Sequence, residues 1–244
     1  MNSTHILKKI YSCLVAALTV SALVLVLGNS GTISWLPAIY IFSSIIILLI
    51  TSLIFPFIWH HREKSGEINS MRINKLLNQS IIYALAINLA TFGFKKIVGL
   101  QFIVPEDVAI RPMNQQSGEW LTWFYFGYSK PFATLLALIQ IIGAYLLFYR
   151  KTQLFATILL LAFMVNLTSI NIFYGLNLGA TLQSILITIG LTYILLLYSR
   201  PLIHAIFNSN VEIAGFKKSN TFNLFSLLAI IFSISFVLYL KYLG

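Results

Sequence analysis

Long stretches without a single charged residue constrain this chain more than any other feature. No Asp, Glu, Lys or Arg lies between Lys9 and Arg62, and none lies between Lys151 and Arg200. An α-helix rises about 1.5 Å per residue, so about 20 apolar residues are needed to cross the hydrocarbon layer of a membrane. Each stretch is therefore long enough for two crossings. The apolar runs are continuous rather than alternating with period two, which favours helices over a transmembrane β-barrel.

Three shorter charge-free stretches each hold one further crossing. The composition agrees, because 59% of the residues are hydrophobic and only 9% are charged, against about 25% charged in an average soluble domain. We therefore predict an all-α, polytopic transmembrane helical bundle of about seven spans. The predicted spans are residues 10–28, 33–58, 76–94, 131–149, 153–173, 178–198 and 221–241.

The basic residues predict an orientation. With the N-terminus inside, the inner segments hold eleven Lys and Arg residues and the outer segments hold five. Because Lys and Arg are enriched in cytoplasmic loops, we expect a cytoplasmic N-terminus and an outer C-terminus. We expect the protein to be a multi-pass protein of a cell membrane, namely a bacterial inner membrane. The same bias explains the net charge of +10, and no basic run on a soluble face indicates nucleic-acid binding. The inner set is Lys8, Lys9, Arg62, Lys64, Arg72, Lys75, Arg150, Lys151, Arg200, Lys217 and Lys218; the outer set is Lys95, Lys96, Arg111, Lys130 and Lys241.

One long connection, residues 95–130, holds most of the outer basic residues and ends in a group of aromatic residues. We expect it to lie on the outer membrane face and to be helical from Glu119 to Phe126. Two interpretations are open, a lid over the bundle and an ordinary aromatic belt at the headgroup level. The domain division that we predict is an N-terminal hairpin and loop (1–75), a four-helix core (76–205) and a C-terminal loop with an extra helix (206–244).

Polar residues inside the spans are the candidates for function, because they are costly in a bilayer. No Asp or Glu lies within any predicted span, which weakens a proton-coupled transporter. Metal-ligand spacings, nucleophile–base arrangements and facing histidine pairs are missing. The amides Gln140, Asn166 and Asn171 each have several hydrogen-bonding groups to satisfy. The adjacent Lys95 and Lys96 would either hold an anionic headgroup, a carboxylate or a quinone carbonyl, or extend to the interface.

Four segments resemble DoxX-like integral membrane proteins. They are F-G-F-K-K-I-V-G-L-Q-F at 92–102, F-G-Y-S at 126–129, I-I-G-A-Y-L-L-F-Y-R-K-T at 141–152 and M-V-N-L-T-S-I-N-I-F-Y at 164–174. The resemblance covers about residues 78–205 and implies a compact four-helix bundle, with a link to thiol or quinone redox complexes for some relatives. The chain resembles the family at Lys96, Gln101, Asn166, Asn171 and Tyr174.

The departures from that family matter for chemistry. Gln140 stands where the family often has an acidic residue, and Tyr174 is followed by Gly-Leu-Asn-Leu-Gly rather than Asp-Val-Pro-Val-Lys. An amide cannot do general acid–base work, so we expect no catalytic residue. We expect Lys96, Gln101, Asn166 and Asn171 to face one outward-opening cavity beneath residues 97–130. Asn166 would form part of its floor, about 7 Å deeper than Asn171.

Three functions follow in order of preference. The first is a non-catalytic membrane subunit or scaffold that binds a partner protein or lipid through the bundle and outer loop, without a cofactor or metal. The second is a redox component that binds a quinone near Lys96, Gln140 and Asn166. The third is a small-solute transporter, which lacks the paired broken helices of that class.

Overall fold

The computed structural model describes residues 5–28 and 36–207, and the described chain is helical. The predicted seventh span, 221–241, and the predicted outer C-terminus lie outside the described residues. The described helices are α1 (Ile6–Leu27), α2 (Ala38–Lys64), α3 (Ser70–Ile97), α4 (Glu106–Ala109), α5 (Gly118–Tyr128), α6 (Lys130–Leu147), α7 (Gln153–Phe173), α8 (Leu178–Leu197) and α9 (Ser199–Phe207), with a 3-10 turn at Met113–Gln115.

Six of the described helices are long and apolar enough to cross a membrane. They are α1, α2, α3, α6, α7 and α8, and each overlaps one of the predicted spans. The chain is therefore an integral membrane protein with an all-α, polytopic bundle. Short α5 lies near the end of the outer connection, residues 95–130. It contains the predicted Glu119–Phe126 helix and extends two residues beyond it at the C-terminal end, which confirms that local prediction.

Two helices are longer than predicted at one end of the bundle. The segment between the predicted spans 33–58 and 76–94 is mostly helical, because α2 continues to Lys64 and α3 already begins at Ser70. The basic residues Arg62 and Lys64 suit the negative end of the α2 dipole. Asn69 caps α3, since its side chain accepts hydrogen bonds from the backbone N–H groups of Met71 (3.0 Å) and Arg72 (3.4 Å).

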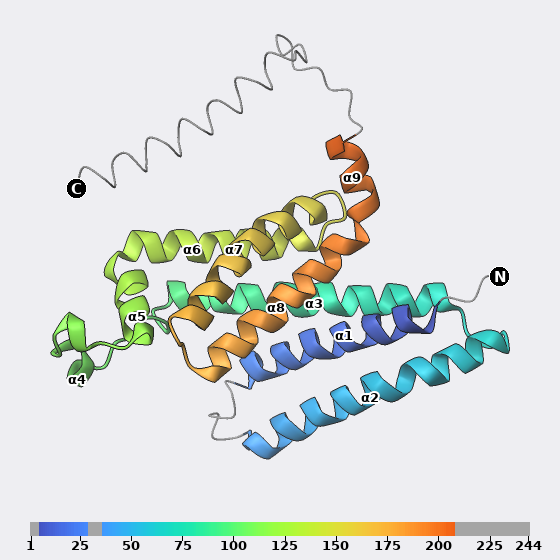
Figure 1. Cartoon of the computed structure of the whole chain (residues 1–244), viewed down its shortest axis with the longest axis horizontal. Coiled ribbons are helices and arrows are strands. Elements are labelled where there is room, and N and C mark those ends of the chain that lie inside the picture. The colour runs from blue at the N-terminus through green and yellow to red at the C-terminus, as the bar shows by residue number, and fades with distance from the viewer. Residues whose placement is uncertain (1–4, 29–35, 208–244) are drawn as a thin grey trace, which may run out of the picture. The chain divides into compact units, whose positions relative to one another are not determined.

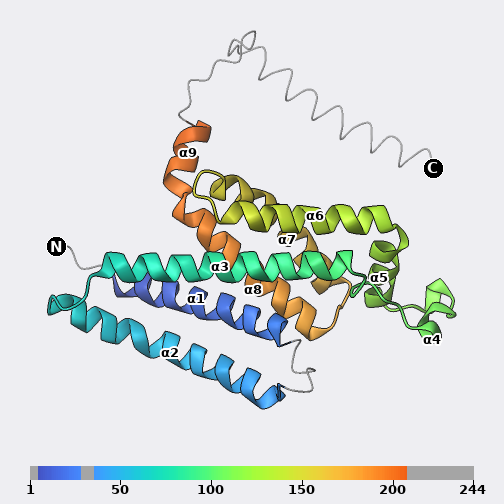
Figure 2. The ribbon, with the colours of Figure 1, turned by 180° about the vertical axis from the view of Figure 1, so that it is seen from behind.

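Most neighbouring long helices pack antiparallel, whereas α1 and α3 pack side by side in the same direction. Helix α3 lies between α1 and α6, while α7 contacts both α6 and α8, and α8 contacts α1 (Figures 1 and 2). The buried core includes Leu85 and Leu89 of α3, Leu160 of α7 and Leu191 of α8. At Gly190, a Cβ atom would lie 2.5 Å from Thr19 and 2.9 Å from Leu85. This glycine therefore allows α1, α3 and α8 to approach closely.

A buried ion pair fastens α1 to α2. Lys9 is 1% exposed and its Nζ contacts Glu63, whose side chain is 8% exposed. Ser70 Oγ also donates to Glu63, and Trp59 Nε1 donates to Ser70 Oγ at 2.8 Å. Glu63 lies outside the predicted span 33–58, which contains no acidic residue, but it lies within helix α2. Helix α2 extends beyond its apolar segment, and its final turn places Glu63 against α1.

The chain divides into two compact units, residues 1–199 and 200–244. The six candidate membrane helices all belong to the first unit. Within it, α1 contacts both α3 and α8. Most of the second unit lies outside the described residues. The predicted domain boundaries near residues 75 and 205 stay predictions.

Candidate functional site

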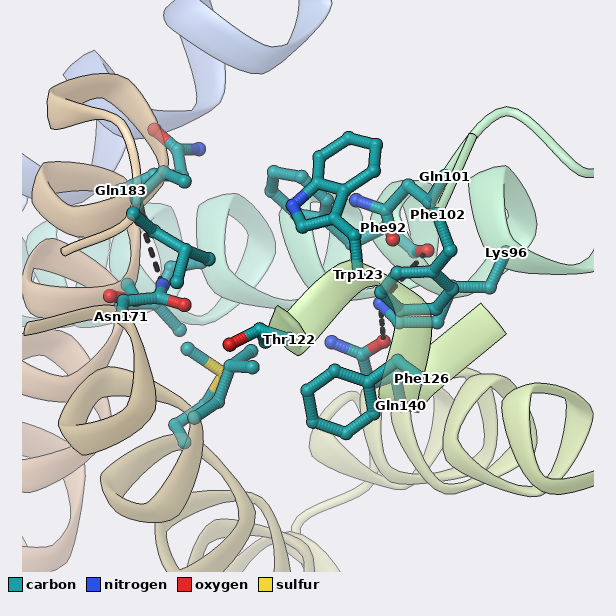
Figure 3. Close-up of a pocket in the computed structure, with 16 residues that line it drawn as sticks. Phe92, Lys96, Gln101, Phe102, Thr122, Trp123, Phe126, Gln140, Asn171 and Gln183 are labelled. Atoms are coloured by element: carbon teal, nitrogen blue, oxygen red, sulfur yellow. Dashed lines mark hydrogen bonds between the residues drawn. The ribbon is translucent and has the colours of Figure 1, made fainter. Parts of the chain in front are cut away.

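A cavity lies at the end of the bundle where α3, α7 and the α5 connection meet. Its volume is about 110 Å³, and the empty space is about 700 Å³ when its opening is included. Its polar wall is formed by Lys96 of α3, Gln101 of the following turn and Gln140 of α6 (Figure 3). A cavity of this size holds more than a few water molecules, so it is a candidate ligand site.

Among the described residues that line the cavity, Lys96 is the one basic residue. Its Nζ donates to Gln140 Oε1 at 2.8 Å and to the backbone oxygen of Phe92 at 3.4 Å. The rings of Phe92 and Phe102 lie 5.9 and 5.8 Å from Nζ, within the range of cation–π attraction. No Asp or Glu is among the described residues that line the cavity. All of these Lys96 partners are therefore neutral.

The opposite wall, formed by α7 and α8, presents oxygen atoms. Asn171 Nδ2 donates to the backbone oxygen of Ala180 at 3.2 Å, and Gln183 Nε2 donates to that of Ala22 at 2.7 Å. One N–H of each amide is thereby bonded to the backbone, which leaves the second N–H and the side-chain oxygen of each residue for a ligand. The cavity is polarised, with a cation on the α3 side and neutral amide groups on the α7–α8 side.

Helix α5 covers the cavity with Thr122, Trp123 and Phe126 (Figure 3). The Phe126 ring stacks on Phe102 with a centroid distance of 5.4 Å. By contrast, Tyr128 is 94% exposed. The aromatic group of the outer connection is therefore divided, with some side chains over the cavity and others facing outward.

The first turn of α5 is attached to the connection between α7 and α8. Glu119 Oε1 accepts a hydrogen bond from Asn177 Nδ2 at 2.9 Å. Gly118 lies against Tyr174, where a Cβ atom would be only 2.4 Å from the Tyr174 backbone oxygen. Because only glycine fits at that distance, the position of α5 depends on Gly118.

The turn after α3 brings Gln101 and Phe102 back to Lys96. Gly99 has a positive φ of 74°, and Phe102 has a positive φ of 65°. A non-glycine residue in this region is strained and is held there by its surroundings, a situation common at ligand sites. The Gln101 side chain lines the cavity, and its buried Oε1 has no hydrogen-bond partner among the described residues.

The predicted site residues do not all meet. Lys96, Gln101, Gln140 and Asn171 line the cavity, but Asn166 is exposed and lines a neighbouring cavity of about 460 Å³, which shares Lys96 with the first. Placing Asn166 in the floor of the same cavity was wrong, because five residues rotate it by about 140° from Asn171. Tyr174 is 52% exposed and is not among the residues that line the cavity.

Two cavity residues were missed by the sequence analysis. Gln183 is an amide inside an apolar span, the same signal that marked Gln140, so it was available in the sequence. Trp123 was assigned only to the aromatic group of the outer connection. Its position over the cavity depends on how α5 packs against the bundle, and no local sequence pattern predicts that packing.

Comparisons with protein-family models, curated proteins and solved structures found no match for this chain. The DoxX-like resemblance therefore stays a prediction, based on the four segments that carry it.

Proposed function

We propose that the chain is a non-catalytic membrane protein that binds an amphiphile in the cavity beneath α5. The ligand has one anionic headgroup, such as a carboxylate, and one apolar chain. The observation that carries this proposal is the set of neutral partners around Lys96. An ammonium group held away from water is costly unless an opposite charge or several hydrogen bonds compensate for it.

The ammonium group of Lys96 has room for an anion. A lysine Nζ has three N–H donors, and Gln140 Oε1 and the Phe92 oxygen accept two of them. The third donor is left for a ligand. A carboxylate placed there would accept this N–H from the ammonium. Charge-assisted hydrogen bonds of this kind are the strong ones.

The rest of the cavity suits an apolar chain. Met164 and Leu167 of α7, Leu176 of the next turn and Ile187 of α8 line it. Because the cavity volume is only about 110 Å³, and about 700 Å³ when the opening is included, a single chain that extends through the opening fits better than the paired chains of a phospholipid. A lipid-derived carboxylate therefore matches both the polar end and the apolar wall.

A quinone is the second candidate, and the aromatic rings beside Lys96 favour it. A quinone has two carbonyl acceptors on opposite sides of its ring. Lys96 would donate to one of them, and Asn171 and Gln183 offer both an oxygen atom and a second amide N–H on the other wall, because only one N–H of each is bonded to backbone. That wall can therefore bind either a second carbonyl or a quinol hydroxyl. Quinol oxidation by the purified protein, abolished in Gln140→Ala, would establish this redox function and overturn the non-catalytic one.

We also propose the membrane, the orientation and the family of the core. The eleven-to-five division of basic residues supports an inner N-terminus and a cavity that opens at the outer side, and the membrane that we propose is a bacterial inner membrane. The segments at 92–102 and 164–174 support a divergent DoxX-like core. A protein partner would reach the ligand through α5 and the connection before it.

The test is ligand binding to the purified full chain in detergent. Titration calorimetry with palmitate and with methyl palmitate separates headgroup charge from chain burial. We expect palmitate to bind, the ester to bind at least about tenfold more weakly, and Lys96→Gln to remove the difference. Lys130→Gln is the matched control, because Lys130 is exposed at the same end and does not line the cavity. Equal binding of acid and ester to the wild type would overturn the proposal.

A further inference from the structure

A second cavity lies at the opposite end of the bundle from α5. Its volume is about 670 Å³, and it lies between the first half of α3, the α6–α7 connection and the end of α8. Figures 1 and 2 show that the start of α3 and the α6–α7 connection share the end farther from α5. It shares no lining residue with the cavity proposed above as the amphiphile site.

Two basic side chains from distant parts of the sequence line this cavity, Lys75 of α3 and Arg150 of the α6–α7 connection. Neither takes part in an ion pair between described residues. No Asp or Glu is among the described residues that line the cavity. The site therefore concentrates positive charge without an internal counter-ion, as an anion site requires.

The wall between the two basic residues is fixed by hydrogen bonds. Tyr193 OH donates to Asn78 Oδ1 at 2.8 Å, which leaves the Asn78 amide nitrogen as a donor. Gln153 accepts from Tyr198 OH at 2.6 Å and donates to the backbone oxygen of Leu147 at 3.1 Å. Arg150 lies in a turn closed by the Thr152 N–H, which donates to the Tyr149 oxygen at 3.1 Å. The Asn78 and Gln153 side chains are thus held in place before any ligand arrives.

The rim of the cavity is apolar on the side that the surrounding lipid reaches. Tyr83 of α3 and Phe148 after α6 are exposed, and their rings lie 5.3 Å apart. A free phosphate would gain nothing from these rings, whereas acyl chains would cover them. We propose that this cavity binds the phosphate headgroup of an anionic phospholipid, with Lys75 and Arg150 at the phosphate and the acyl chains along Tyr83 and Phe148. Basic pockets between membrane helices are suited to anionic headgroups.

Native mass spectrometry of the full chain, with phosphatidylglycerol and phosphatidylcholine of identical acyl chains, tests this site. We expect the wild type to retain phosphatidylglycerol preferentially. Lys75→Gln or Arg150→Gln should each weaken its binding about fivefold, and the double variant about thirtyfold. Lys75→Arg with Arg150→Lys keeps both charges and should retain the lipid, which separates charge loss from misfolding.

Two controls make the result specific. Lys151→Gln removes an exposed charge beside Arg150 that does not line the cavity, so lipid retention should be unchanged. A loss as large as that of Arg150→Gln would indicate general surface charge and overturn the proposal. Excess inorganic phosphate should not displace the lipid, and displacement would identify a soluble-anion site instead. Equal retention of both lipids by the wild type would also overturn it.

Discussion

Lys96 Nζ donates a 2.8 Å hydrogen bond to Gln140 Oε1, although the two residues are 44 positions apart in the sequence. The bond connects the last turn of α3 to the middle of α6 and places a cation against a neutral amide. Its strength depends on the charge of the ammonium, since hydrogen bonds to charged groups contribute about 1.5–3 kcal/mol. The pair therefore both joins two helices and leaves positive charge in the cavity for a ligand.

Gln140→Glu should weaken binding of an anionic amphiphile at least about tenfold, because the new carboxylate gives Lys96 its own counter-ion and repels the ligand headgroup. Gln140→Leu should weaken it less, since it adds no negative charge. Titration calorimetry with palmitate measures both. Wild-type affinity in Gln140→Glu would contradict the placement of the headgroup at Lys96.

Gly118→Ala should detach the start of α5, because its methyl group would lie 2.4 Å from the Tyr174 backbone oxygen. Such overpacking costs about 1–3 kcal/mol. Hydrogen exchange of residues 118–128 should accelerate, while exchange in α3 stays unchanged. Gly179→Ala is the control, since its nearest neighbour would be at an ordinary 3.4 Å. Unchanged exchange in α5 after Gly118→Ala would show that this contact does not hold the helix.

Glu63→Gln should destabilise the protein by about 3–5 kcal/mol, the usual cost of removing one partner from a buried ion pair. Lys9 would then remain buried, at 1% exposure, without its counter-ion. Replacing both residues, as Lys9→Met with Glu63→Leu, should recover most of the loss because no unpaired charge is left. The thermal unfolding midpoint in detergent measures this, and a double variant less stable than Glu63→Gln would refute the explanation.

Cysteine labelling tests the orientation, in a Cys13→Ala background that removes the native cysteine. Ser65→Cys lies in the α2–α3 connection and Ser117→Cys precedes α5, and both positions are exposed. With the N-terminus inside, Ser65→Cys should react only with a membrane-permeant reagent, whereas Ser117→Cys should react with an impermeant one. The same test applies to Ser209→Cys, which lies outside the described residues and should behave like Ser65→Cys. The reverse pattern at residues 65 and 117 would invert the proposed topology.

Much of the fold follows from the sequence because charge and length act locally. A charge-free run of sufficient length becomes a membrane helix wherever it lies in the chain. All six predicted spans within the described residues therefore correspond to helices, and α5 was found by its own pattern. The boundaries of α2 and α3 were missed, because a polar segment such as Arg62–Lys64 can continue a helix beyond its apolar run.

The sequence by itself determined the all-α class, the positions of the membrane helices and the amides available for function. Only the tertiary structure decided which of those polar groups meet: Lys96 with Gln140, Lys9 with Glu63, and Asn171 rather than Asn166 in the cavity beneath α5. The physical reason is that these helices are apolar on nearly every side, so no polar stripe shows which face turns inward. In a membrane, close packing and hydrogen bonds between helices set that rotation, and both depend on residues far apart in the chain.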